Sequence, residues 1–115
     1  MTTPAKKPKS KSDKKISNDQ TKQLRRIGHG LKPVVMLGNN GVSSGVIEEV
    51  VRALRDHELI KIKVIGDDRD ERQQLIQTIA KQTTATVVQS IGKVALLYKK
   101  NPQANPKLSN VARFG

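Results

Sequence analysis

The stretch PVVMLGNNGVSSGV, residues 33–46, determines how the rest of the chain is arranged. Its apolar run at 34–37 is typical of a short buried strand, and the turn Gly38–Gly41 follows at once. A helical pattern then begins, and either Ser43 or Ser44 is placed to cap its first turn. The chain therefore passes from a strand through a glycine-flanked turn to a helix N-terminus. This arrangement exposes backbone N–H groups and the positive end of a helix dipole, which together favour a phosphate.

The composition points to a polyanionic partner. The chain has 115 residues, which suits one small domain with tails, and its 22 Lys and Arg against 10 Asp and Glu give a net charge of +12. The absence of cysteine excludes disulfides, thiolate metal sites and a cysteine nucleophile. No apolar run has the length of a transmembrane helix, and the N-terminus lacks the apolar segment of a secretory signal. We expect a cytoplasmic protein without membrane association.

The charge and proline pattern divides the chain into three parts. Residues 1–15 hold six lysines and no large apolar residue after Met1, which predicts a disordered Lys-rich arm. Residues 16–100 carry the periodic apolar patterns of a folded domain and a net positive charge of their own. Two Asn-Pro steps then break regular structure, which predicts a flexible C-terminal tail over 101–115. Deleting the arm should weaken polyanion binding without abolishing it.

Within the folded part, the periodicity predicts three helices and four strands. Ser17 with Gln20, and Asp68 with Glu71, each fit a capping box at the start of a helix. Two strand–helix–strand crossovers favour parallel pairing, and the turn at Gly92 makes the last strand antiparallel. We therefore expect a single compact α/β domain of order α-β-α-β-α-β-β, with helices packed on a mixed four-stranded sheet. The predicted helices span about 17–28, 43–57 and 68–83, and the strands about 34–37, 59–65, 85–91 and 94–99.

The G-x-x-G turn is the first candidate binding element. Glycine at both ends permits tight backbone angles and close approach of a ligand backbone, and the two asparagines offer side-chain donors. KH domains clamp single-stranded RNA with a loop of this form. Val42 follows the turn where a Walker loop needs Lys and then Ser or Thr, and the three-glycine dinucleotide fingerprint is absent too. The predicted loop contacts are Gly38, Asn39, Asn40, Gly41 and Ser43.

Basic residues near this loop in the sequence are the second candidate element. In the strand at 59–65, Lys61 and Lys63 alternate with aliphatic residues, which predicts one apolar face and one basic face. Charged faces of this kind are commonly just solvated. The alternative is that they surround the loop with positive charge and contact RNA phosphates. The predicted contacts of this group are Lys22, Arg25, Arg26, Lys32, Lys61 and Lys63.

The sequence gives little support to catalysis, metal binding or a cofactor. His29 and His57 are isolated and favour structural or surface roles, and no nucleophile, acid–base or metal-ligand spacing accompanies them. The acidic residues at 67–71 are typical of helix capping rather than of a metal site. Tyr98 and Phe114 are too few for a platform of paired aromatics, so RNA binding is expected to use phosphate and shape contacts.

Three separated motifs resemble the CRM-domain family, specifically its small bacterial YhbY-like RNA-binding proteins. They are LKPVVMLGNNGVSSGV at 31–46, HELIKIKV at 57–64 and IGKVALLYK at 91–99, within a resemblance that extends from about Ile16 to Lys100. The resemblance implies a fold similar to the C-terminal domain of bacterial translation initiation factor three. It also implies RNA binding through Gly38–Gly41 and the adjacent basic surface, and association with ribosomal RNA in large (50S) subunit precursors.

The leading hypothesis is a monomeric, non-enzymatic RNA-binding protein that acts in large-subunit ribosome assembly. A general nucleic-acid-coating protein driven by the arm at 1–15 is the main alternative, and it predicts equal affinity for duplex DNA and structured RNA. An enzyme acting on RNA or a nucleotide lacks a credible acid–base pair. A protein-interaction module within the ribosome cannot be separated from the leading hypothesis by sequence.

Overall fold

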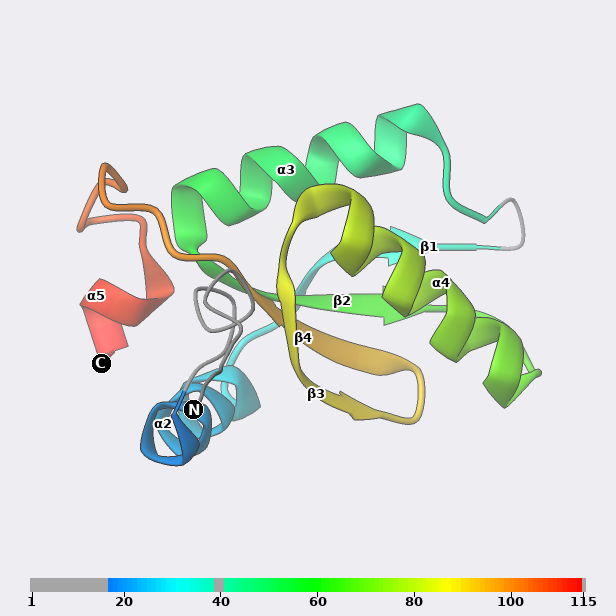
Figure 1. Cartoon of the computed structure of the whole chain (residues 1–115), viewed down its shortest axis with the longest axis horizontal. Helices are drawn as coiled ribbons and strands as arrows, with labels where there is room; N and C mark the ends of the chain where they lie inside the picture. The colour runs from blue at the N-terminus through cyan, green and yellow to red at the C-terminus, as the bar shows by residue number, and fades with distance from the viewer. Residues whose placement is uncertain (1–16, 39–40, 115) are drawn as a thin grey trace, which may run out of the picture.

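The computed structural model describes residues 17–38 and 41–114 of the chain, so the predicted arm at 1–15 lies outside the described residues. Helices and strands alternate in the predicted order (Figure 1). A further short helix follows the last strand. The elements are α2 (Asn18–His29), β1 (Pro33–Leu37), α3 (Ser44–His57), β2 (Leu59–Val64), α4 (Arg69–Thr83), β3 (Thr86–Ile91), β4 (Val94–Tyr98) and α5 (Asn110–Phe114).

The strands form one mixed four-stranded sheet of order β1-β2-β4-β3, which confirms the predicted fold class. β1 and β2 are parallel neighbours, and β4 is antiparallel to both β2 and β3. β2 and β3 run in the same direction without pairing, because the returning strand β4 lies between them. The loop that follows β1 and the start of α4 after β2 consequently lie at the same edge of the sheet (Figure 1).

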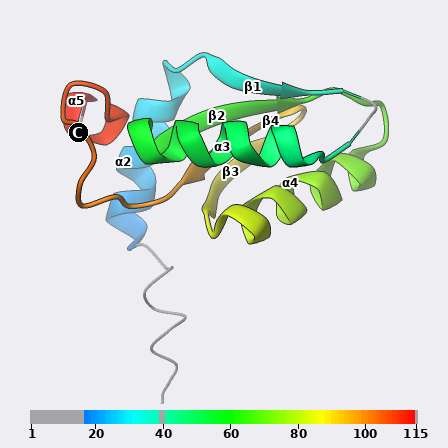
Figure 2. The ribbon, with the colours of Figure 1, turned by 90° about the horizontal axis from the view of Figure 1, so that it is seen from above.

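Helices cover both faces of the sheet (Figures 1 and 2). They enclose two apolar clusters. On one face, α3 and α4 pack against alternate residues of β2, namely Ile60, Ile62 and Val64. On the other face, α2 and α5 cover only one end of the sheet, where Leu24 and Ile27 contact the second cluster. The strand-like alternation of β2 gives the apolar face and the basic face that the sequence predicts, and it directs Lys61 and Lys63 to the α2 side.

β1 is less buried than its apolar sequence predicts. Val35 and Leu37 are buried beneath α3, but the alternate residues Val34 and Met36 are exposed. The reason is the position of β1 at the edge of the sheet, at a place that α2 does not cover. One face of the strand therefore belongs to the core and the other face is open.

Gly28 fixes how closely α2 approaches the sheet. A β-carbon on Gly28 would lie 2.4 Å from Leu96 Cδ1, well inside van der Waals contact. Only glycine therefore permits this helix–sheet packing without displacing Leu96. The close approach holds the carboxyl end of α2 against Leu96 of β4.

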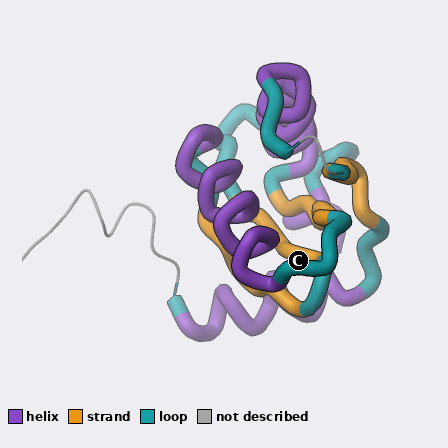
Figure 3. Tube along the Cα trace, turned by 90° about the vertical axis from the view of Figure 1, so that its right-hand side faces the viewer, coloured by secondary structure: helices purple, strands orange, loops and turns teal. Residues whose placement is uncertain are grey.

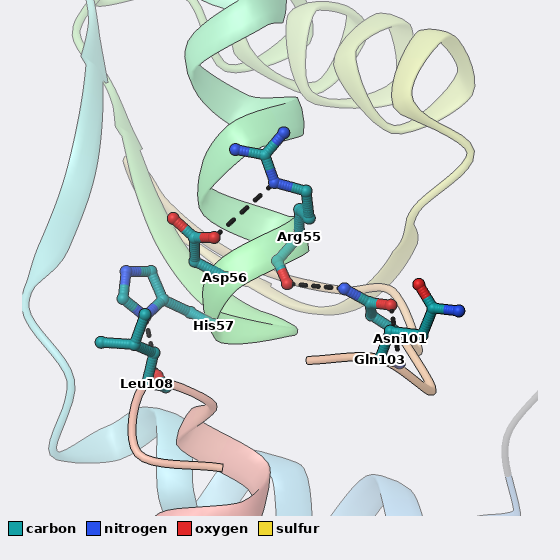
Figure 4. Close-up of polar contacts among 6 residues, drawn as sticks. All are labelled: Arg55, Asp56, His57, Asn101, Gln103 and Leu108. Carbon is teal, nitrogen blue, oxygen red and sulfur yellow. Dashed lines mark hydrogen bonds and ion pairs between the residues drawn. The ribbon is translucent and has the colours of Figure 1, made fainter. Parts of the chain in front are cut away.

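Residues 101–114 pack against the domain, whereas the sequence predicts a flexible tail there. Glu58, which adopts a positive φ of 62° after α3, accepts hydrogen bonds from the Asn101 N–H and the Ser109 hydroxyl, each 2.7 Å long. Nearby, Asn101 Nδ2 donates to the Arg55 carbonyl and His57 Nδ1 lies 2.8 Å from the Leu108 carbonyl (Figure 4). These polar contacts reach across about fifty positions of sequence, so local pattern does not reveal them.

Candidate nucleic-acid interface

The predicted G-x-x-G loop joins β1 to α3. The Gly41 N–H donates to the Gly38 carbonyl at 3.3 Å, and Gly41 has φ +74°. Gly41 therefore occupies backbone space that favours glycine, whereas a β-carbon on Gly38 would meet no atom within 4 Å. Asn39 and Asn40, the other predicted loop contacts, lie outside the described residues. The loop's conformation thus depends on Gly41 more than on Gly38.

The first turn of α3 leaves donors available at the protein surface. Ser43 is the N-cap, and its Oγ accepts the Val46 N–H at 3.2 Å while its carbonyl accepts the Ile47 N–H. Helix geometry gives the N–H groups of Ser44 and Gly45 no intrahelical acceptor. The first turn contains no acidic residue, and Ser43, Ser44 and Gly45 are exposed. An anion can therefore approach two backbone donors at the positive end of the helix dipole.

Lys63 and Lys61 connect this loop to the rest of the α2 side of the sheet. Lys63 is the β2 partner of Met36, close to the end of β1, and Lys61 is the partner of Pro33 at the start of β1. This part of the sheet is open, with Met36 and Ile91 each 65% exposed. A hollow of about 240 Å³ lies farther along, between Lys61 and the carboxyl end of α2. Lysines and apolar groups therefore alternate on an uncovered sheet surface.

The cations of α2 lie at the other end of the molecule from the G-x-x-G loop (Figures 1 and 2). Figure 3, which is seen from the loop end, shows α2 at the bottom of the molecule. Leu24 and Ile27 face the sheet, so Lys22, Arg25 and Arg26 point outward at helical spacing, and all three are exposed. Lys32 precedes β1, about 20 Å from Gly38 at the usual rise of an extended strand. The structure thus separates the predicted contacts into a group at the loop with Lys63 and a group at α2 with Lys32. Lys61 lies between the two groups.

Charge is distributed unequally between the two faces of the sheet. Apart from Asp19, every acidic residue of the described ranges lies in α3, in α4 or directly beside them. The α2 side carries mainly cations, and Lys22, Arg25 and Arg26 form no ion pair with any described residue. A polyanion is therefore attracted to the α2 side of the sheet.

The two histidines and Tyr98 lie in three different environments. His57 contacts the Leu108 carbonyl, and His29 is exposed at the end of α2 beside Lys61. Burial raises the pKa of Tyr98, the charge of Glu58 raises it further, and a hydrogen bond with Gln20 acts in the opposite direction. The described part of the chain contains no group of three His, Cys, Asp or Glu side chains that could hold a metal ion. Within the same ranges, no helix is long and apolar enough to cross a membrane.

Known proteins resemble this chain along most of its length. The model of the CRS1/YhbY (CRM) domain matches residues 16–99. A probable RNA-binding protein of Pseudomonas aeruginosa is 48% identical over 99 residues, which cover 86% of this chain and 95% of the relative. An RNA-binding protein of Haemophilus influenzae is 44% identical over 93 residues, covering 81% and 94% of the two chains. The solution structure of a hypothetical protein from Staphylococcus aureus aligns with a TM-score of 0.69 at 25% identity, covering 79% of this chain and 95% of the other.

Proposed function

We propose that this chain, which belongs to the CRS1/YhbY (CRM) domain family, binds RNA. The observation that carries the proposal is the start of α3, where a glycine turn presents the backbone N–H groups of Ser44 and Gly45 without a nearby carboxylate in the first turn. The names of the two bacterial relatives, and the net charge of +12, support RNA as the polyanion.

In this proposal, one phosphate of the RNA backbone accepts hydrogen bonds from the first turn of α3. The glycine turn lets the RNA backbone approach closely, and Lys63 supplies a neighbouring positive charge on the same edge. These contacts read the backbone and not the bases, so they give affinity with little sequence preference. Lys61 then continues the positive surface toward Lys32 and the exposed cations of α2.

The finer proposal is that the RNA is ribosomal RNA of a large-subunit precursor, bound without catalysis by a monomer in the cytoplasm. Its support is the resemblance of the motifs at 31–46, 57–64 and 91–99 to the bacterial YhbY-like proteins. An arm with six lysines at 1–15 adds charge for the same partner. The competing proposal, general coating of nucleic acid, assigns most of the affinity to that arm.

Aspartate at both loop glycines tests the binding mechanism. Gly38→Asp with Gly41→Asp should lower affinity for a single-stranded RNA, measured by fluorescence anisotropy, because two carboxylates would face the phosphate. Gly92→Asp is a matched control, since Gly92 also has a positive φ, of 58°, in the turn between β3 and β4. Unchanged affinity in a folded double variant would show that the loop does not hold the RNA.

Fractionation of cell extracts tests the finer proposal. Co-sedimentation with large-subunit precursors, and RNA crosslinks at Gly38–Gly41, are the expected results. Sedimentation with messenger RNA, transfer RNA or chromosomal DNA, with crosslinks confined to 1–15, would instead support general coating. A variant that lacks residues 1–15 separates the two proposals. Binding by the folded domain predicts a weakened but measurable RNA affinity, whereas general coating by the arm predicts a nearly complete loss of affinity.

A further inference from the structure

We propose that a hollow between α2 and α5 holds one unpaired base of a single-stranded RNA, stacked on Phe114. The hollow is lined by Arg26, Ile27, Gly30, Leu31 and Phe114, and we call it the α2–α5 hollow. The proposal rests on the proposed RNA binding and adds a base subsite to it. Phe114 lies beyond the residues 16–99 that match the family model, whereas the other lining residues lie within that range. The proposed stacking residue therefore comes from a segment outside the matched domain.

The size and lining of the α2–α5 hollow suit a small planar group. Its volume is about 250 Å³, below the range typical of pockets for drug-sized ligands. Ile27 and Leu31 supply apolar walls, and Gly30 contributes no side chain that would fill the space. A single base is thus a better match than a larger ligand.

Phe114 is the exposed aromatic residue of the chain. The sequence contains no tryptophan and one tyrosine, and that tyrosine, Tyr98, is only 7% exposed in the core. The Phe114 side chain is 52% exposed, and the Arg113 guanidinium carbon lies 4.9 Å from the ring centroid. The guanidinium takes one face of the ring by a cation–π contact and leaves the other face for a base.

Phe114 is held in place by contacts elsewhere in its segment. Ser109, which is 1% exposed, donates its hydroxyl proton to Glu58 and accepts the Ala112 N–H, so it caps α5. Asn110 Nδ2 donates to the Leu59 carbonyl at 2.7 Å, and Val111 packs on the apolar cluster beneath α2. The ring therefore projects from an anchored helix, which lowers the ordering cost of stacking.

Charge favours a nucleotide over a neutral aromatic ligand at this position. Arg26 lines the α2–α5 hollow, Arg113 contacts the ring, and none of the residues that line the hollow is acidic. The phosphates flanking a stacked base would meet both guanidinium groups. A paired base within a duplex offers no free face, so the occupant is a base of a single-stranded region.

Three variants of Phe114 in the full chain test the proposal. Phe114→Trp creates the sole tryptophan of the protein, and its fluorescence should be quenched when a single-stranded oligoadenylate RNA binds. Phe114→Ala should lower affinity for that RNA by about tenfold, within the range expected for one stacked base. Phe114→Leu, which keeps an apolar side chain without an aromatic face, should show nearly the same loss. A fully paired, blunt-ended RNA duplex should bind all four proteins equally.

The outcomes separate this proposal from the proposed function. Wild-type affinity of the alanine and leucine variants, or unquenched tryptophan in a protein that binds RNA, would overturn the subsite and leave RNA binding intact. Failure of the wild-type chain to bind any RNA would overturn both. Thermal unfolding of each variant serves as a check, because an exposed ring at the end of a five-residue helix should contribute little to global stability.

Discussion

α3 and α4 begin at the same edge of the sheet, yet their first turns are built differently. In α4, one carboxylate oxygen of Asp68 accepts two N–H groups, from Asp70 at 2.8 Å and from Glu71 at 3.2 Å. In α3, the hydroxyl of Ser43 accepts a single N–H from the described residues, that of Val46. The first turn of α4 also contains two acidic residues, whereas that of α3 contains none.

The difference indicates which helix N-terminus is available to an external anion. Each acidic group near a helix N-terminus typically stabilises the helix by about 0.3–1 kcal/mol, so the sequence of α4 satisfies its own dipole. The first turn of α3 lacks that stabilisation, because Ser44 and Gly45 stand at exposed positions where an acidic residue would fit. We therefore infer that the exposed donors of α3 serve the proposed RNA binding rather than folding.

Giving α3 the acidic character of α4 should have the largest effect on function. We expect Ser44→Glu to lower RNA affinity about tenfold or more, because the new carboxylate would repel the phosphate. Two like charges about 4 Å apart repel each other by about 1 kcal/mol in bulk water and by about 4 kcal/mol near a protein surface. The free energy of unfolding should stay the same or rise by about 0.3–1 kcal/mol, because the new carboxylate interacts with the helix dipole. Anisotropy titrations and urea unfolding measure the two quantities.

Ser44→Gln is the matched control, since it adds similar bulk without charge and should keep most of the affinity. An equal loss in the Gln and Glu variants would assign the effect to bulk and not to the dipole. A folded Glu variant with full affinity would remove α3 from the binding mechanism.

The loops that precede α3 and α4 should differ in whether their glycine can be replaced without loss of stability. Gly41 before α3 has φ +74°, and Gly66 before α4 is not among the residues of positive φ. Gly41→Ala should therefore lower the free energy of unfolding by about 1–2 kcal/mol, the usual cost of left-handed backbone for an L-residue. Gly66→Ala should have little effect, since its β-carbon would meet Arg72 Cγ at an ordinary 4.0 Å. Equal losses in thermal or urea unfolding would contradict the assigned turn.

Local sequence determines much of this edge of the sheet. The alternation of Ile60 and Ile62 with Lys61 predicts which face of β2 is basic, because side chains of a strand alternate between faces. The cap Asp68 is predicted directly, and Ser43 is one of the two predicted candidates for the cap of α3, since an N-cap contacts residues only two or three positions away. Both features depend on a few consecutive residues.

The sequence pattern does not determine how segments that are distant in the sequence are arranged in space. Closeness in sequence predicts that Arg25 and Arg26 lie near the G-x-x-G loop, but β1 separates them and places the loop at the opposite end of the sheet (Figure 1). Insertion of β4 between β2 and β3 depends on strand pairing that periodicity does not determine. The docking of α5 depends on Glu58, a surface-type residue that becomes a hydrogen-bond acceptor for Asn101 and Ser109.

Removing the cap of α4 should have the smallest effect and should change stability alone. Asp68→Ala should lower the free energy of unfolding by about 1 kcal/mol, because the Asp70 and Glu71 N–H groups lose their acceptor. Asp68→Ser should recover most of that loss, since serine is also a strong N-cap. RNA affinity should be unchanged in both variants, because Asp70 and Glu71 remain in the first turn of α4 and still disfavour a phosphate there. If either variant bound RNA more tightly, α4 would contribute a repulsive term to the interface, and the separation of the two helices into one for folding and one for binding would not hold.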